Sequence, residues 1–68
     1  MPSTVIRHIA YDEPSRTLVV SFISGAVYAY SDVPPQTYAD FTSAFAKGRF
    51  FAARIRDRFP HRQVQLQA

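Results

Sequence analysis

The chain contains no cysteine and only two glycines. Without thiols it cannot form a disulfide framework or a thiolate metal site, and two glycines do not make a glycine-rich phosphate loop. No apolar run approaches the roughly 20 residues that a membrane-spanning helix requires. Residues 1–4 lead directly into a short mixed segment and show no signal-peptide pattern. We therefore expect a cytoplasmic protein with neither a membrane nor a metal among its partners.

The apolar content is sufficient for one small domain. Hydrophobic residues make up 47% of the 68 residues, and they include four tyrosines and six phenylalanines. A chain of this length buries only about 60% of the surface that its unfolded form exposes, so its core is close to the lower limit for independent folding. We predict a single domain over residues 1–68, with an ordered core over 3–60 and a short, polar, loosely held tail over 61–68.

Three segments have the composition and the bounding turns of β-strands. They are Val5–Tyr11, Arg16–Ile23 and Ala26–Ser31. In the second of them, Leu18, Val20 and Phe22 alternate with other residues and give one wholly apolar face. Asp12–Ser15 has the composition of a turn, and Ser24-Gly25 that of a hairpin loop. These features predict an antiparallel meander.

Two registers are open for the second hairpin. A two-residue loop would pair Phe22 with Val27. A three-residue loop with a bulge would shift the return strand by one residue, which places the apolar face of the second strand on the same side as Tyr28 and Tyr30. We favour the three-residue loop because it gathers the large side chains into one core.

Helical signals follow the meander. Pro34 and Pro35 suit the first turn of a helix, where the missing N–H costs no hydrogen bond. Tyr38, Phe41 and Phe45 then recur at helical spacing and predict an apolar stripe.

The second helix is separated from the first by a glycine. We take Gly48 as the break between the two helices, because the helical periodicity resumes from Arg49 to Phe59 and Pro60 ends it. The order of elements is β-β-β-α-α. It predicts an α+β fold: a three-stranded antiparallel β-meander followed by two α-helices packed on one face.

Positive charge is concentrated near the C-terminus. Residues 47–62 hold six of the eight basic residues against one acid, Asp57, which gives them a formal charge of about +5. The six are Lys47, Arg49, Arg54, Arg56, Arg58 and Arg62. On a helical wheel, basic side chains border an apolar arc formed by Phe51, Ala52, Ile55 and Phe59. They either contact the phosphates of a nucleic acid or only rest their stems on apolar surface and solubilise the domain.

Two further features are open to a functional and a structural interpretation. If a helix begins near Gly48, its free N–H groups lie beside Lys47 and Arg49 and form an anion site; alternatively, Lys47-Gly48 caps the preceding helix. Tyr28 and Tyr30 share a strand face. They are candidates for stacking on unpaired bases, or they pack under the helices with their hydroxyls at the rim.

No motif indicates catalysis. His8 and His61 are far apart in the sequence and lack the spacing of metal ligands. We expect His8 to be partly buried or at a sheet edge, and His61 to be exposed. No serine lies in a nucleophile-elbow motif, and the adjacent carboxylates Asp12 and Glu13 fall in a turn. We therefore expect no enzymatic activity and no cofactor.

The order and spacing of several short motifs resemble the KTSC domain family. The motifs are Tyr11-Asp12, Leu18-x-Val20-x-Phe22, Ser24-Gly25, Tyr28-x-Tyr30, Val33-Pro34, Lys47-Gly48-x-Phe50-Phe51 and Ile55-Arg56. That family takes its name from the C-terminus of some lysyl-tRNA synthetases and also occurs as small free-standing bacterial proteins. The resemblance implies a domain of unknown function for which RNA binding has been suggested, and it carries no catalytic residues.

Two functions from different classes therefore remain. The first is a non-catalytic module that binds RNA, including tRNA, through the six basic residues, with Tyr28 and Tyr30 as candidates for base stacking. The second is a protein-interaction or homodimerisation module. In that case an edge strand such as Val5–Tyr11 would offer unpaired backbone groups to a partner protein or to a second copy of the chain.

Overall fold

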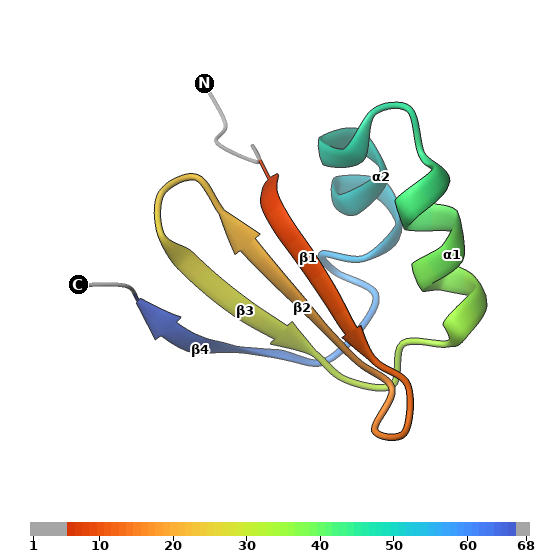
Figure 1. Ribbon diagram of the computed structural model, residues 1–68, viewed down its shortest axis with the longest axis horizontal. Coiled ribbons are helices and arrows are strands. Elements are labelled where there is room, and N and C mark those ends of the chain that lie inside the picture. Colours follow the sequence, from red (N-terminus) through yellow and green to blue (C-terminus); the bar gives the residue numbers. More distant parts are fainter. Residues whose placement is uncertain (1–5, 67–68) are drawn as a thin grey trace.

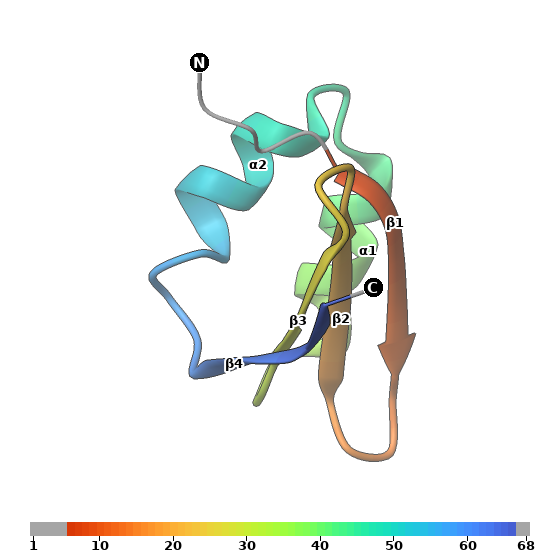
Figure 2. The ribbon, with the colours of Figure 1, turned by 90° about the vertical axis from the view of Figure 1, so that its left-hand side faces the viewer.

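The computed structural model describes residues 6–66, which form a four-stranded antiparallel sheet and two helices (Figure 1). The elements are β1 (Ile6–Asp12), β2 (Thr17–Phe22), β3 (Ala26–Tyr30), α1 (Pro35–Ser43), α2 (Lys47–Arg54) and β4 (His61–Leu66). The strands lie in the order β1-β2-β3-β4, and both helices pack on one face (Figure 2). The predicted α+β fold is confirmed, with one additional strand. Val5, the predicted start of the first strand, lies outside the described residues, as do residues 3–4 and 67–68.

The three-residue loop predicted for the second hairpin is confirmed. Leu18 pairs with Tyr30 and Val20 with Tyr28, so these four side chains share the face that the helices cover. Gly25 adopts a φ of 100°, and its N–H donates to the carbonyl oxygen of Phe22 at 2.9 Å. The register follows the hydrophobic pattern because a slip by one residue would move every large side chain of β3 to the other face.

The two glycines occupy different backbone conformations and predict opposite effects of alanine. Gly25 has a positive φ, whereas Gly48 lies inside α2 and is not the predicted break between the helices. We expect Gly25→Ala to lower the free energy of unfolding by about 1–2 kcal/mol, because a Cβ atom is strained at positive φ. Gly48→Ala should raise it by about 0.5–1 kcal/mol, because glycine is a poor helix former. Urea denaturation measures the free energy of unfolding of both variants. A Gly25→Ala variant as stable as the wild type would contradict the positive φ of Gly25.

The core lies between the helices and the sheet. Its buried residues are Leu18, Val20, Phe22, Tyr30, Val33, Phe41, Phe51 and Ile55. Tyr38 of α1 stacks on Tyr11 of β1, with ring centroids 4.7 Å apart. Phe41 of α1 stacks on Phe50 of α2 at 5.4 Å. These contacts attach α1 to the sheet and to α2, so the two short helices are held by packing rather than by their own stability.

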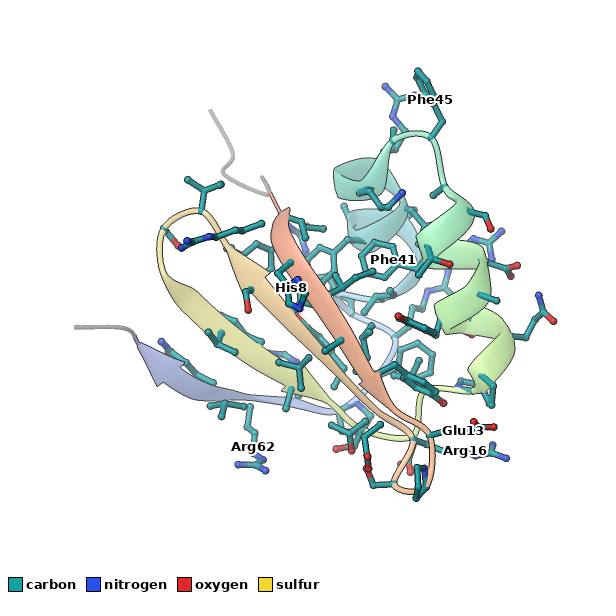
Figure 3. The ribbon with its side chains drawn as sticks, viewed as in Figure 1. His8, Glu13, Arg16, Phe41, Phe45 and Arg62 are labelled. Atoms are coloured by element: carbon teal, nitrogen blue, oxygen red, sulfur yellow. The ribbon has the colours of Figure 1, made fainter. Side chains whose placement is uncertain are left out.

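Phe45 does not belong to the apolar stripe predicted for α1. Phe41 is fully buried and Tyr38 is half-buried, but the Phe45 side chain is completely exposed, at 104% relative accessibility. It stands at the tip of the connection between α1 and α2 (Figure 3). The reason is that α1 ends at Ser43, and Ala44 adopts an extended conformation, so the helical spacing does not reach Phe45.

The C-terminal quarter differs most from the prediction. α2 ends at Arg54 rather than at Phe59, and the chain then turns through residues 55–60 to enter β4. The N–H of Ser31 donates to the carbonyl oxygen of Pro60 at 2.8 Å, which joins the end of β3 to the start of β4. Residues 61–66 therefore belong to the sheet rather than to a loosely held tail. Pro60 disfavours helical geometry at the residue before it, but the pairing of β4 with β3 requires the chain to leave the helix still earlier.

Within residues 6–66, neither helix is long and apolar enough to span a membrane. The same residues contain no group of three or more His, Cys, Asp or Glu side chains positioned to hold a metal ion. His8 lies on edge strand β1 and pairs with Ser21, on the face opposite the helices (Figure 3).

Candidate functional site

Five of the six predicted basic residues lie in α2 and the turn that follows it, here called the basic segment (residues 47–58). Lys47, Arg49 and Arg54 are on α2, whereas Arg56 and Arg58 lie in the turn. All are exposed except Lys47, which is half-buried. The helical wheel is therefore wrong for Arg56 and Arg58, because the helix ends before them. It is also wrong for Ala52, which is exposed rather than part of the buried stripe.

The sixth residue, Arg62, is not part of this surface. It lies on β4 and pairs with Ala29 of β3, on the sheet face opposite the helices (Figure 3). The neighbouring strand position, His61, pairs with Tyr30 and therefore lies on the helix side. Five of the six predicted basic residues thus lie on α2 and the turn after it, and the sheet separates Arg62 from them.

The contacts of the basic side chains are few and weak. Lys47 Nζ donates to the carbonyl oxygen of Ala44 at 2.7 Å, and the guanidinium of Arg54 lies 5.6 Å from the ring centroid of Phe50. α2 does begin near Gly48, as the anion-site prediction requires, and Gly48 is not the C-cap of α1, although the Lys47 ammonium bonds to the carbonyl of Ala44, which is that C-cap. The ammonium of Lys47, which would assist anion binding at the N-terminus of α2, already donates a hydrogen bond to the backbone carbonyl oxygen of Ala44.

The ion pairing of the segment is also weak. Within residues 6–66, one ion pair is found, from Arg56 Nε to Asp57 Oδ2 at 3.9 Å, with both side chains more than half exposed (52% and 84%). An exposed pair at this distance contributes at most about 1 kcal/mol and leaves the guanidinium available to another anion.

The two candidate stacking tyrosines have different environments. Tyr30 is only 3% exposed, because Phe51 meets it edge-on at 5.6 Å and His61 stacks on it at 5.2 Å. A base could stack on Tyr30 only if it displaced the His61 ring or a residue of the core. Tyr28, two residues earlier on the same strand, is half-buried. The structural interpretation thus holds for Tyr30, while stacking on Tyr28 stays a prediction.

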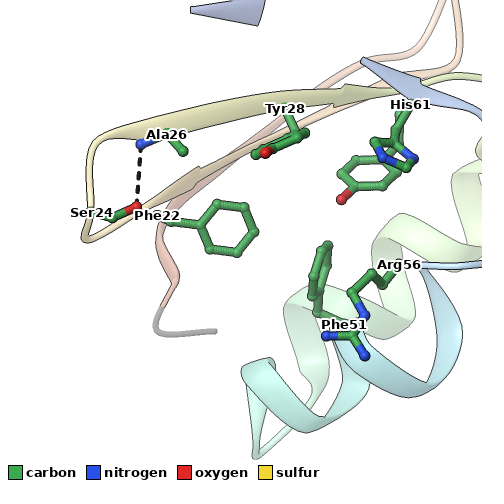
Figure 4. Close-up of a pocket in the computed structure, with 8 residues that line it drawn as sticks. Phe22, Ser24, Ala26, Tyr28, Phe51, Arg56 and His61 are labelled. Carbon is green, nitrogen blue, oxygen red and sulfur yellow. Dashed lines mark hydrogen bonds between the residues drawn. The ribbon is translucent and has the colours of Figure 1, made fainter. Parts of the chain in front are cut away.

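A pocket of about 320 Å³ opens between β3, the start of β4 and the end of α2 (Figure 4). We call it the aromatic pocket. Its lining residues are Phe22, Ser24, Ala26, Tyr28, Tyr30, Phe51, Arg56 and His61. The side chains of Phe22, Tyr28, Phe51 and His61 extend toward a common space from four different elements, and Arg56 reaches the pocket beside Phe51 from the turn after α2 (Figure 4). Of the five basic residues of the segment, Arg56 is the one that lines this pocket.

The sequence pattern did not place His61 or Arg56 in a pocket. His61 is exposed, as predicted, but β4 lays its ring against Tyr30 and Tyr28, at centroid distances of 5.2 and 5.8 Å. Arg56 reaches the pocket because the chain leaves α2 two residues earlier. The sequence signal for β4 was the alternation of polar and apolar residues in Gln63-Val64-Gln65-Leu66. This signal is weak because it covers four residues, two of which are glutamines.

Burial raises the pKa of Tyr30 from 10.0 to about 12, and the negative charge of a nearby Tyr28 phenolate adds to the effect. The guanidinium of Arg56 acts in the opposite direction, which places its positive charge close to the Tyr30 hydroxyl. The folded state therefore prefers the neutral phenol, and the stability this provides is complete below pH 10 and is lost as the pH rises toward 12.

This shift predicts a pH dependence of folding. Between pH 10 and 12, the free energy of unfolding should fall more steeply in the wild type than in a Tyr30→Phe variant, which has no hydroxyl to ionise. Chemical denaturation at a series of pH values measures both slopes. Equal slopes would contradict the assignment of the raised pKa to Tyr30.

The sequence matches the KTSC domain family over residues 2–59. A crystal structure of a KTSC domain protein from Yersinia pestis superimposes with a TM-score of 0.88 and 35% identity, covering 96% of this chain and 92% of that one. A protein from Tsukamurella paurometabola is 35% identical over 57 residues, which cover 84% of this chain and 85% of the relative.

Part of a larger enzyme is also similar to this chain. The lysine–tRNA ligase of Nostoc punctiforme is 36% identical over 61 residues, which are 90% of this chain but only 11% of the ligase. The relatives therefore include both small proteins and a region of a much longer one. The match over most of the sequence and the close structural agreement show that this chain belongs to the KTSC domain family.

Proposed function

We propose that this KTSC domain is a non-catalytic module that binds RNA, with tRNA among its targets, through the exposed side chains of the basic segment. The observation that carries the proposal is the concentration of Lys47, Arg49, Arg54, Arg56 and Arg58 in twelve consecutive residues whose single acid is Asp57. Such a cluster attracts a phosphate backbone and releases its counterions. An RNA-binding role also agrees with a cytoplasmic location, which we propose with it.

The placement of these charges supports phosphate contacts. α2 is packed through Phe51 and Phe50 onto the core, so Arg49 and Arg54 project from a fixed scaffold. Arg56 and Arg58 lie in the turn after it, next to the buried Ile55. Basic side chains on a rigid element position a nucleic-acid backbone without reading its bases. The relationship to a region of lysine–tRNA ligase, an enzyme whose name specifies tRNA, is a reason to include tRNA among the probes.

The test is the binding of fluorescently labelled tRNA to the whole chain at two salt concentrations. If about four phosphates are contacted, the association constant should fall by roughly 50- to 150-fold between about 50 and 200 mM monovalent salt. The absence of binding at the lower salt concentration would refute the proposal. An unrelated RNA of the same length shows whether tRNA is preferred.

A second candidate function is self-association or binding of a partner protein through the edge of β1. The observation that favours it is the position of β1 at one edge of the sheet, with Arg7, His8 and Ala10 exposed. An edge strand presents unpaired backbone groups to another strand, although the charge of Arg7 opposes such pairing. The mass in solution tests self-association: a dimer that persists at high salt favours it, and a monomer that binds RNA excludes it as the main role.

A further inference from the structure

The aromatic pocket is bounded by five rings that contact one another in a closed circuit. Phe22 meets Tyr28 at 6.0 Å, Tyr28 meets His61 at 5.8 Å, and His61 meets Tyr30 at 5.2 Å. Tyr30 meets Phe51 at 5.6 Å, and Phe51 closes the circuit with Phe22 at 5.4 Å. Four of these five contacts are edge-on or tilted rather than stacked, so most ring faces in the circuit are not covered by a parallel ring.

The circuit has a buried floor and an open rim. Phe22, Tyr30 and Phe51 are between 2% and 7% exposed and belong to the core. Tyr28 is half-buried and His61 is exposed, so these two rings form the rim. A floor fixed by core packing and a rim of amphipathic rings together provide a preformed surface for a flat group.

Arg56 is the one Lys or Arg side chain among the residues that line this pocket. Arg56 lines the pocket beside Phe51, and its side chain is 52% exposed (Figure 4). Its partner Asp57 lies 3.9 Å away and is itself 84% exposed, so the pair is weak. An anionic group next to a bound ring would therefore find a guanidinium in reach.

The volume limits what the pocket can hold. At about 320 Å³, it is at the lower end of the range of small-molecule sites, which begins at roughly 300 Å³. It can accept a single planar heterocycle with one attached charged group rather than a longer ligand. A nucleobase joined through its sugar to a phosphate has this combination of a flat ring, modest size and negative charge.

We propose that the aromatic pocket binds one nucleotide, with the base against the aromatic rings beside Tyr28 and the phosphate on Arg56. The nucleotide is either free or an unpaired residue of a bound RNA, and in the second case the inference rests on the proposed function. Tyr28 would then supply the stacking predicted from the sequence, and His61 would take the place assigned to Tyr30. Duplex RNA cannot place a base in the pocket unless the base leaves the helix.

The direct test is titration of the whole chain with adenosine 5′-monophosphate, followed by calorimetry and by the NMR signals of the Tyr28 and His61 rings. Adenosine, which lacks the phosphate, and inorganic phosphate, which lacks the base, serve as partial ligands. We expect the nucleotide to bind at least tenfold more tightly than either. The absence of heat and of ring shifts at roughly 10 mM nucleotide would overturn the proposal.

Variants test the two assigned roles. Arg56→Gln should weaken nucleotide binding by about 10-fold or more, because it removes a charge-assisted hydrogen bond. Tyr28→Ala should weaken it by about 5- to 100-fold through loss of base stacking. Arg16→Gln is the matched control for charge, since Arg16 lies in the turn between β1 and β2 and does not line the pocket. Circular dichroism confirms folding, and equal weakening by Arg16→Gln would refute the role of Arg56.

RNA titrations separate this inference from the proposed function. A single-stranded oligonucleotide should lose affinity in Tyr28→Ala, whereas duplex RNA should not. If RNA binds Tyr28→Ala with unchanged affinity and the mononucleotide gives neither heat nor ring shifts, the pocket inference fails and the proposed function stands. If the mononucleotide binds and no RNA does, the proposed function fails and the pocket is a site for free nucleotides.

Discussion

The Phe51→Ala variant is expected to lose about 3–5 kcal/mol of folding free energy, the usual cost of removing a buried aromatic side chain. Phe51 is 2% exposed and is the point at which α2 meets the sheet. Its ring contacts Phe22 of β2 at 5.4 Å and Tyr30 of β3 at 5.6 Å. The substitution removes both contacts and leaves a void beneath the aromatic pocket, which the surrounding rings can fill only in part.

This loss is large compared with the stability that a domain of this size can have. At about 0.05–0.15 kcal/mol per residue, a chain of this length is stable by roughly 3–10 kcal/mol. We therefore expect Phe51→Ala to be largely unfolded, or to unfold at a much lower urea concentration than the wild type. Urea denaturation followed by circular dichroism measures the difference.

Phe45→Ala is the matched control, since it deletes the same side chain from a fully exposed position. Its stability should stay within about 0.5 kcal/mol of the wild type. A loss of similar size in both variants would show that the aromatic residues contribute through the unfolded state rather than through the packing described.

Removal of two arginines from the basic segment should reduce both the RNA affinity and its dependence on salt. Arg49 and Arg58 are exposed and do not line the aromatic pocket, so Arg49→Gln/Arg58→Gln affects the basic segment alone. Each lost phosphate contact should lower the slope of log K against log salt by about 0.7–1. We expect the double variant to show a slope smaller by roughly 1.5–2 and a corresponding loss of affinity at low salt.

The matched control removes two arginines from elsewhere. Arg16 lies in the turn after β1 and Arg62 on the sheet face opposite the helices (Figure 3), so Arg16→Gln/Arg62→Gln changes the net charge by the same amount away from the basic segment. If both double variants lower the slope equally, RNA affinity depends on the net charge of the protein rather than on the basic segment. Anisotropy titrations at three or more salt concentrations give the slopes, and circular dichroism confirms that both variants are folded.

The sequence by itself determined the meander, the hairpin register and the central core. Leu18, Val20 and Phe22 alternate so strictly that a single face of β2 can be buried. Phe41 and Phe51 are the buried residues of α1 and α2, so each helix packs on the sheet through the side that carries its phenylalanine. These features depend on local periodicity, because strand and helix repeats assign each side chain to a face before any long-range contact exists.

The basic segment was also evident in the sequence, but its shape was not. A charge count needs no geometry, so residues 47–58 could be selected at once. The helical wheel extended α2 to Phe59, whereas the helix ends at Arg54. Arg56 therefore lines a pocket instead of bordering a helix, and Arg62 lies on the opposite sheet face.

Only the tertiary structure decided where the last strand lies and what it brings together. β4 has little hydrophobic signal of its own, and it forms because β3 offers it a row of backbone hydrogen-bonding groups. That pairing places His61 against Tyr30, across more than thirty residues of sequence, and ends α2 early enough for Arg56 to face the same space. Contacts between distant segments depend on the packing of the whole domain rather than on local pattern. The aromatic pocket could therefore not be predicted, because each of its residues, taken alone, has the properties of an ordinary core or surface position.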